Sequence, residues 1–228
     1  MATIFGETHI RESVTGKPVG IGGVPGRLQA TGYGVAKITE KAISEILDND
    51  LTDVTIAIQG FGNVGFWARK TLYELGAKVI AISDKYGGTI NSKGLNFEQL
   101  SQYYRQKNTV HGFNGSSISN EDLLRLEVDV LIPAAIENVI TESNVPLVKA
   151  KMIVEGANAP LSKAAHSFLY KKGVPIVPDV LANAGGVIAS YEEWRISKAG
   201  LLATEKDTLN NVEMTLLKAF EEVFCKFS

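Results

Sequence analysis

Three glycines directly after a short apolar run are the residues whose spacing points most clearly to chemistry. Gly60, Gly62 and Gly65 form the pattern G-x-G-x-x-G, and residues 54–58 before them alternate as a β-strand does. Gly60 would permit a tight turn, Gly62 would let the backbone approach a pyrophosphate, and Gly65 would let a helix pack closely on its strand. The first N–H groups of that helix would then bind phosphate.

An acid at the end of the next strand completes this pattern. Residues 64–75 follow a helical period, and residues 78–83 form a second β-rich run that ends at Asp84. An acid at this point of a strand-helix-strand unit can bind the ribose hydroxyls of a dinucleotide. Its charge would repel a 2′-phosphate and favour NAD, whereas Lys85 beside it would accept NADP. The sequence therefore predicts NAD or NADP as cofactor, with NAD preferred.

Composition excludes several other classes of function. The 45% hydrophobic content is ordinary for a soluble globular protein, and the net charge of −2 argues against a dedicated binder of nucleic acid or of membrane surfaces. No apolar run approaches the roughly 18 residues of a membrane span. The single Cys225 excludes an intramolecular disulfide, and the first residues resemble no signal or transit peptide, so we expect a cytoplasmic protein. His9, His111 and His166 lack the spacing of metal ligands, and no metal site is predicted.

Strands alternate with helices along the chain, which predicts an α/β, Rossmann-like doubly wound and mostly parallel sheet with flanking helices. Further strands are predicted at residues 128–133, 151–155 and 174–179, the last at an edge because of its prolines. Residues 85–94 are predicted to be turn-rich. Helices are predicted to begin near residues 31, 63, 97, 119, 162, 182 and 203.

Three parts of the chain are expected. Residues 1–30 form an irregular segment rich in glycine and proline, in which Arg27 is interpreted as a solvated charge. Residues 31–202 form the dinucleotide-binding domain, and residues 203–228 form a C-terminal helix that packs on it. The apolar residues of this helix are expected to leave an exposed patch that favours self-association, namely Phe220, Phe224 and Phe227.

Seven segments of the chain together resemble one protein family. They are residues 15–18, 26–32, 59–65, 132–140, 155–160, 178–187 and 190–194. In this order they resemble the nucleotide-binding domain of hexameric glutamate dehydrogenase, and the resemblance covers nearly the whole chain. It implies reversible oxidative deamination of L-glutamate to 2-oxoglutarate and ammonia, with hydride transfer to NAD or NADP, in a homohexamer.

The resemblance also implies roles for particular residues. Thr31 would contact the nicotinamide amide, Asn158 and Asn183 would orient the nicotinamide end, and Val187 and Ser190 would contact the substrate, Ser190 through the side-chain carboxylate. Residues implied to bind the cofactor are Thr31, Gly60, Phe61, Gly62, Asn63, Val64, Gly65, Asp84, Ala134, Ala135, Asn158 and Asn183.

The family's catalytic lysines and aspartate lie in a preceding domain, near a glycine-rich segment that has no counterpart in this sequence. The resemblance therefore implies no catalytic residue in this chain, and Lys17 is not a substitute for one. We expect a cofactor domain truncated at both ends, which binds dinucleotide without turnover.

Two alternatives stay open. A leucine, valine or phenylalanine dehydrogenase would share the same cofactor domain, although the polar Ser190 suits a carboxylate better than an apolar substrate side chain. A non-catalytic NAD-binding regulatory module is the second alternative. Glu192 and Glu193 do not indicate a paired acid and base, because adjacent helical positions diverge by about 100°.

Overall fold

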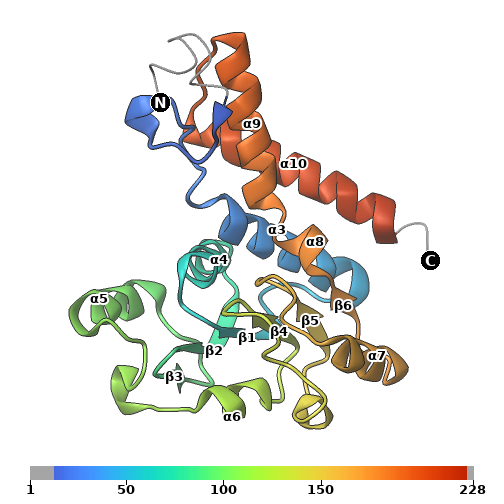
Figure 1. The fold of residues 1–228 in the computed structure, drawn as a ribbon. Helices are drawn as coiled ribbons and strands as arrows, with labels where there is room; N and C mark the ends of the chain where they lie inside the picture. The colour runs from blue at the N-terminus through green and yellow to red at the C-terminus, as the bar shows by residue number, and fades with distance from the viewer. Residues whose placement is uncertain (1–12, 225–228) are drawn as a thin grey trace.

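The computed structural model describes residues 13–224, and six strands form its single sheet (Figure 1). The strand order is β3-β2-β1-β4-β5-β6, and every neighbouring pair is parallel except β2 and β3. The strands are β1 (Thr55–Gln59), β2 (Lys78–Asp84), β3 (Gly87–Ile90), β4 (Val130–Pro133), β5 (Met152–Val154) and β6 (Ile176–Val177). This order is that of a doubly wound sheet, so the predicted fold class is confirmed.

Eight α-helices and three 3-10 turns connect and cover the strands in the described part of the chain. The helices are α3 (Ala30–Ile46), α4 (Asn63–Glu74), α5 (Phe97–Lys107), α6 (Asn120–Leu124), α7 (Lys163–Lys171), α8 (Asp179–Ala182), α9 (Gly185–Ala199) and α10 (Glu205–Phe224). The 3-10 turns are η1 (Val19–Ile21), η2 (Phe113–Gly115) and η3 (Val145–Leu147). None of these helices combines the length and the apolar character that crossing a membrane requires.

The pleat of the strands divides the core between the two faces of the sheet. Ile56 and Ile58 of β1 are buried in one apolar cluster with residues of α3, α4 and α5, whereas Ala57 between them belongs to a second cluster with residues of α6 and α7. Successive side chains of a strand point to opposite faces, so this alternation places a helical layer on each side (Figure 1). Both faces are therefore closed to water, as a parallel sheet requires.

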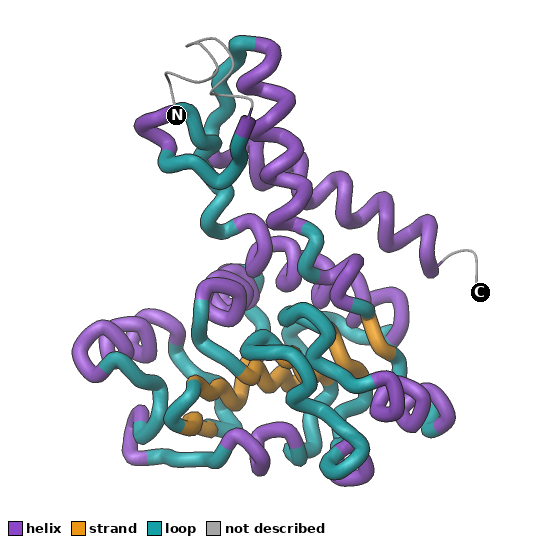
Figure 2. The backbone as a smooth tube through the Cα atoms, in the orientation of Figure 1, coloured by secondary structure: helices purple, strands orange, loops and turns teal. Residues whose placement is uncertain are grey.

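Helix α10 packs against the layer that contains α3, α4 and α5, and its aromatic residue Phe220 is buried there. Figure 2, in the orientation of Figure 1, shows the strands in the lower half of the molecule, with α9 rising away from them and α10 crossing above them. Phe220 of α10 is 1% exposed, and its ring stacks on that of partly buried Phe224. The prediction of an exposed apolar patch is therefore wrong at Phe220, because α10 packs on α3. Phe227 and Cys225 lie outside the described residues, as does His9.

Polar contacts fix α10 along α3 as well. Glu213 of α10 accepts a hydrogen bond from the Tyr33 hydroxyl and lies 3.1 Å from the Lys37 Nζ atom. Burial, and then the bond to Glu213, raises the pKa of the Tyr33 hydroxyl. Further along, Lys41 of α3 lies 3.6 Å from Glu221 of α10.

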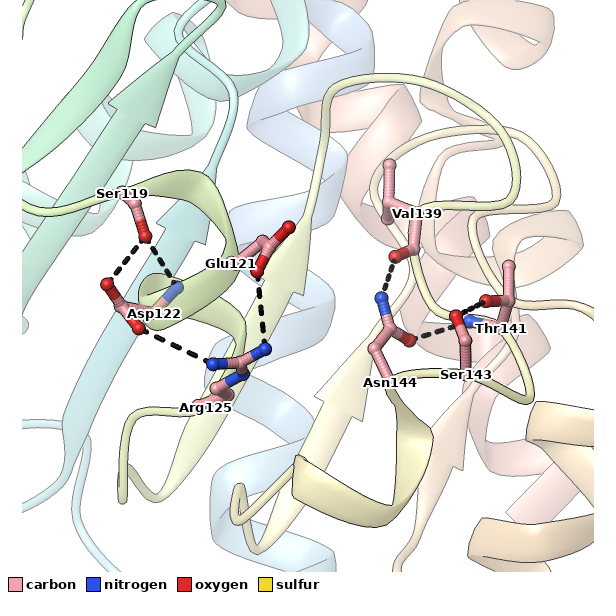
Figure 3. A network of polar contacts seen from close by, with 8 residues as sticks. All are labelled: Ser119, Glu121, Asp122, Arg125, Val139, Thr141, Ser143 and Asn144. Atoms are coloured by element: carbon pink, nitrogen blue, oxygen red, sulfur yellow. Dashed lines mark hydrogen bonds and ion pairs between the residues drawn. The ribbon is translucent and has the colours of Figure 1, made fainter.

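Hydrogen bonds from side chains fix the start of α6 and the turn before η3, and both of these short elements pack in the second apolar cluster. Both sets of bonds are visible in Figure 3. The Ser119 hydroxyl accepts the Asp122 N–H at 3.0 Å and donates to the Asp122 carboxylate, which begins α6 as predicted. Asn144 accepts the Thr141 N–H at 2.8 Å and donates to the Val139 carbonyl at 2.8 Å. These bonds satisfy backbone groups that would otherwise lack partners.

Strand β3 is an element that the sequence did not predict. Residues 85–94 were expected to form turns, but Gly87–Ile90 pair antiparallel with β2, with Asp84 opposite Gly87 and Ala81 opposite Ile90. Two adjacent glycines hide the strand, because glycine carries no side chain to show a period. The predicted edge position of the proline-containing strand is confirmed, since β6 ends the sheet.

The packing of α10 can be tested with two substitutions on that helix. Phe220→Ala should lower the free energy of unfolding by about 3–5 kcal/mol, because it leaves a cavity in the core. Met214→Ala, at a position 72% exposed, should change it by less than about 0.5 kcal/mol. Urea unfolding followed by circular dichroism measures both values. Equal effects of the two substitutions would contradict the burial of Phe220.

Candidate functional site

Two adjoining cavities lie along the edge of the sheet where the strands end. They have volumes of about 590 Å³ and 820 Å³, and both are lined by Ala134, Ala135 and Ile136. These residues follow β4, which pairs with β1 so that Gln59 lies opposite Pro133. The shared wall makes one elongated cleft at the point where the strand order reverses, between β1 and β4.

The smaller cavity contains the glycine-rich loop and Asp84. Its lining includes Gly60, Phe61 and Gly62 after β1, and Asp84 at the end of β2. Phe61 is 3% exposed, and its ring meets Tyr104 of α5 edge-on at 4.9 Å between centroids. The predicted convergence of the glycine motif and the acid is therefore observed.

Asp84 is held in a defined orientation by backbone groups. One carboxylate oxygen accepts the Tyr86 N–H at 2.8 Å, and the other accepts the Val110 N–H at 2.7 Å. Its carbonyl accepts the Asn120 side-chain amide at 2.8 Å, and Asn120 in turn accepts the Ser83 hydroxyl. The carboxylate is thus positioned before any ligand binds.

The protein's own backbone requires glycine at two of the three motif positions, Gly60 and Gly65. Gly60 has φ 107°, a conformation that side chains rarely adopt. A Cβ atom on Gly65 would lie 1.9 Å from the Gly60 carbonyl oxygen, so α4 could not pack on the loop. Gly62 has φ −74°, and a Cβ atom there would meet nothing within 4 Å. No contact inside the protein requires glycine at position 62, and it borders the cleft at the N-terminus of α4.

The larger cavity brings together residues from widely separated parts of the chain. Thr31 of α3, Val64 of α4, Asn158 after β5, Asn183 after α8 and Val187 of α9 all line it. The Asn183 side-chain amide donates to the Asn158 side-chain carbonyl at 2.8 Å. The two asparagines therefore form one hydrogen-bonded pair, and both lie at the cavity wall, where a cleft role was predicted for each.

Arg27 is bound, and not the solvated charge expected from the sequence. Its Nε atom donates to the Ser190 hydroxyl at 2.9 Å, and Arg27 lines the larger cavity. The interpretation as a solvated charge was wrong. The partner, Ser190, lies 163 positions away in the sequence, so the residues around Arg27 do not indicate it. A guanidinium beside a hydroxyl is a suitable partner for a carboxylate.

Three predicted site residues lie beside the cleft instead of lining it. Asn63 donates to the Leu28 carbonyl at 3.0 Å, Gly65 is buried beneath the loop, and Ser190 reaches the cavity through Arg27. Four other lining residues were not predicted, because they belong to no motif: Tyr86, Tyr104, Asn108 and Asn120. Lys85 was expected beside the cofactor, and the lining residues that lie in segments of the resemblance without an implied role are Gln59, Ile136, Glu137, Gly156, Ala157 and Gly186.

The adjacent acids of α9 have separate partners. The Glu193 carboxylate lies 2.5 Å from the Lys17 Nζ atom and accepts the Gly16 N–H at 2.9 Å. Glu192 binds Arg195 at 2.6 Å and accepts from the Asn211 side chain at 3.2 Å. This geometry agrees with the prediction that the two acids share no acid–base task.

The family assignment follows from comparison with known proteins. A model of the glutamate/leucine/phenylalanine/valine dehydrogenase family matches residues 22–227. The chain belongs to this family.

Glutamate dehydrogenases are among the relatives of this chain. The chain is 46% identical over 206 residues to glutamate dehydrogenase of Aeropyrum pernix, and this match covers 90% of the chain and 49% of that protein. It is 40% identical over 211 residues to an NADP-specific glutamate dehydrogenase of Saccharolobus shibatae, which covers 92% of the chain and 50% of that protein. The chain thus spans about half the length of the curated relatives it matches.

Solved structures of dehydrogenases of this family share the fold. Glutamate dehydrogenase of Peptoniphilus asaccharolyticus superposes with a TM-score of 0.79 at 34% identity, over 92% of this chain and 49% of that one. The hetero-hexameric glutamate dehydrogenase of Thermus thermophilus gives 0.82 at 29% identity, over 90% and 48%.

Gly65 is packed against fixed backbone and Gly62 is not, so we predict that substituting them has different effects on the stability of this dehydrogenase family member. Gly65→Ala should lower the free energy of unfolding by about 1–3 kcal/mol, because its Cβ atom overlaps fixed backbone. Gly62→Ala should change it by less than about 0.5 kcal/mol. Thermal and urea unfolding of the two variants provide the comparison. A larger loss for Gly62→Ala would show that the loop is packed differently.

Proposed function

We propose that this chain is the cofactor-binding part of a glutamate dehydrogenase and holds NAD or NADP along the cleft. Gly62 is the observation that carries the proposal, since nothing within the protein requires a glycine there. A pyrophosphate at the N-terminus of α4 explains it, because the backbone must approach the phosphates closely. The adenosine end then lies beside Asp84, and the nicotinamide end lies beside Asn158 and Asn183.

The proposed reaction of the whole protein is reversible oxidative deamination of L-glutamate to 2-oxoglutarate and ammonia. The nicotinamide cofactor supplies the hydride acceptor, and the residues of this chain bind and orient it. Thr31 and the asparagine pair surround the nicotinamide end in this proposal, while Val64 and Val187 add apolar side chains to the cavity wall. The groups that transfer protons come from outside these 228 residues. Lys17 is held by Glu193 and serves the fold.

The bond between Arg27 and Ser190 favours glutamate over the apolar substrates of related dehydrogenases. The guanidinium retains donors beyond its Nε bond to Ser190, and a substrate carboxylate near them would gain a charge-assisted hydrogen bond. A leucine or valine side chain placed there would leave a charged group desolvated without a partner. A leucine, valine or phenylalanine dehydrogenase is therefore the second candidate, and exposed Val187 is the feature that favours it.

For the cofactor itself we propose NAD or NADP, with NAD preferred. The carboxylate of Asp84 is fixed in the smaller cavity and would repel a 2′-phosphate. The charge of Lys85 would favour NADP instead. Its Nζ atom lies 4.7 Å from the centroid of the Tyr86 ring, a cation–π contact that a 2′-phosphate would compete with. The relative from Saccharolobus shibatae is NADP-specific by name.

Two further proposals concern the organisation of the whole protein. Residues 1–30 would form an inter-domain segment, residues 31–202 the dinucleotide-binding domain, and residues 203–228 a helix that packs on it. The whole protein would be a homohexamer, and the isolated chain would bind dinucleotide without turnover. The hetero-hexameric structure from Thermus thermophilus supports a six-subunit assembly for the parent.

Calorimetry with NAD and NADP tests the cofactor assignment. The chain should bind NAD more tightly than NADP, and Asp84→Asn should reduce this preference by about tenfold, because the charge that repels a 2′-phosphate is gone. Glu74→Gln, on the exposed face of α4, is the matched control and should leave the preference unchanged. Absence of a binding signal with both dinucleotides would rule out the proposed function.

A further inference from the structure

Glu155 is a buried acid that lines neither cavity. It follows β5 directly, and its side chain is 3% exposed. One carboxylate oxygen lies 2.9 Å from the Nε2 atom of His166 on α7, and the other accepts the N–H of Asp179, the first residue of α8, at 2.9 Å. A buried carboxylate is costly unless it is hydrogen-bonded, so this position requires a reason.

The contacts of Glu155 join the elements that carry the two cleft asparagines. Asp179 accepts the Ala159 N–H at 2.7 Å, which ties the loop after β5 to the start of α8. Ala159 has φ 42°, a left-handed conformation that costs free energy for a residue other than glycine, so the loop depends on such an anchor. Asn158 precedes Ala159, and Asn183 ends α8.

The result is a fixed pair of amides in the larger cavity. The Asn183 amide nitrogen lies 2.8 Å from the Asn158 side-chain oxygen, and 3.5 Å from the Gly156 carbonyl oxygen. Asn158 is exposed, so its orientation depends on its hydrogen bond to Asn183 and on the loop that carries it. An amide pair in one orientation presents defined donors and acceptors to another amide.

The charges around Glu155 come from the two helices packed against it. His166 on α7 faces it from one side and Asp179 on α8 from the other. Burial raises the pKa of the Glu155 carboxyl, whereas the Asp179 N–H and His166 oppose the rise. The acid therefore has hydrogen-bond partners on both oxygens, and no contact with the cavity itself.

We propose that Glu155 is a positioning residue that sets the Asn158–Asn183 pair for the nicotinamide end of the dinucleotide. This inference rests on the proposed function. Glu155 acts through α8 and the loop after β5, and it does not touch the cofactor. It determines how well the nicotinamide is held, and the adenosine and pyrophosphate are held elsewhere, by Asp84 and the glycine loop.

Affinities for NADH and ADP-ribose test this proposal in the 228-residue chain. ADP-ribose has the adenosine and pyrophosphate of the cofactor and lacks the nicotinamide. Glu155→Gln should weaken NADH binding by about fivefold to tenfold, the equivalent of one hydrogen bond, and leave ADP-ribose affinity unchanged. NADH fluorescence gives the first affinity, and displacement of NADH by ADP-ribose gives the second.

Two further variants keep the test independent of folding defects. Asp129→Asn removes another largely buried acid, which accepts the Thr55 N–H at 2.7 Å and pairs with Lys151 at the opposite end of β5. It should change neither affinity. His166→Ala removes one partner of Glu155 at a side chain that is 41% exposed, and it should weaken NADH binding in the same direction. Thermal unfolding checks that each variant is folded.

Three outcomes are distinguishable. A loss of NADH affinity without a loss of ADP-ribose affinity, in Glu155→Gln and His166→Ala but not in Asp129→Asn, supports the positioning role. Equal losses for both ligands, or no loss in either variant, overturn it. If the unsubstituted chain binds neither ligand, the proposed function itself fails.

Discussion

The reversal of strand order at β1 is the constraint on which the rest of the structure depends. The chain leaves β1 toward β2 on one side and returns to β4 on the other side. Gly60 after β1 and Ala135 after β4 therefore both line the cleft at this point, where a Cβ atom on Gly60 would lie only 2.9 Å from the Ala135 backbone nitrogen. The contact of Gly65 with the Gly60 carbonyl then directs the N-terminus of α4 toward this cleft.

Local signals in the sequence were sufficient for most of the fold. Helix α5 begins at the predicted residue, because Asn96 accepts the Gln99 N–H at 2.9 Å, and Asn108 ends the helix in a left-handed conformation. The spacing of the glycine motif is likewise a local signal, since a Cβ atom on Gly65 would overlap the Gly60 carbonyl oxygen. Strand β3 was missed, because pairing with β2 defines it and its own glycines do not.

Contacts between distant residues account for what the sequence could not predict. Arg27 reaches Ser190, and Phe220 enters a core built by α3, so neither residue has the exposure that its own segment suggests. The same holds for Glu155, whose partners come from α7 and α8. In each case the partner of the side chain lies on an element that is distant in the sequence and comes near only in the folded chain. Helical and strand periodicity gives no information about such a partner.

Amide NMR of the isotopically labelled chain during titration with NAD tests the central claim most directly, because it reports each backbone position separately. The account predicts shifts concentrated at Gly60, Gly62, Asp84 and Asn158, along one edge of the sheet. Lys93 and Gly94, which border a separate cavity near the start of β2, should not move. Shifts centred on Lys93 and Gly94, or no shifts at saturating NAD, would contradict the account.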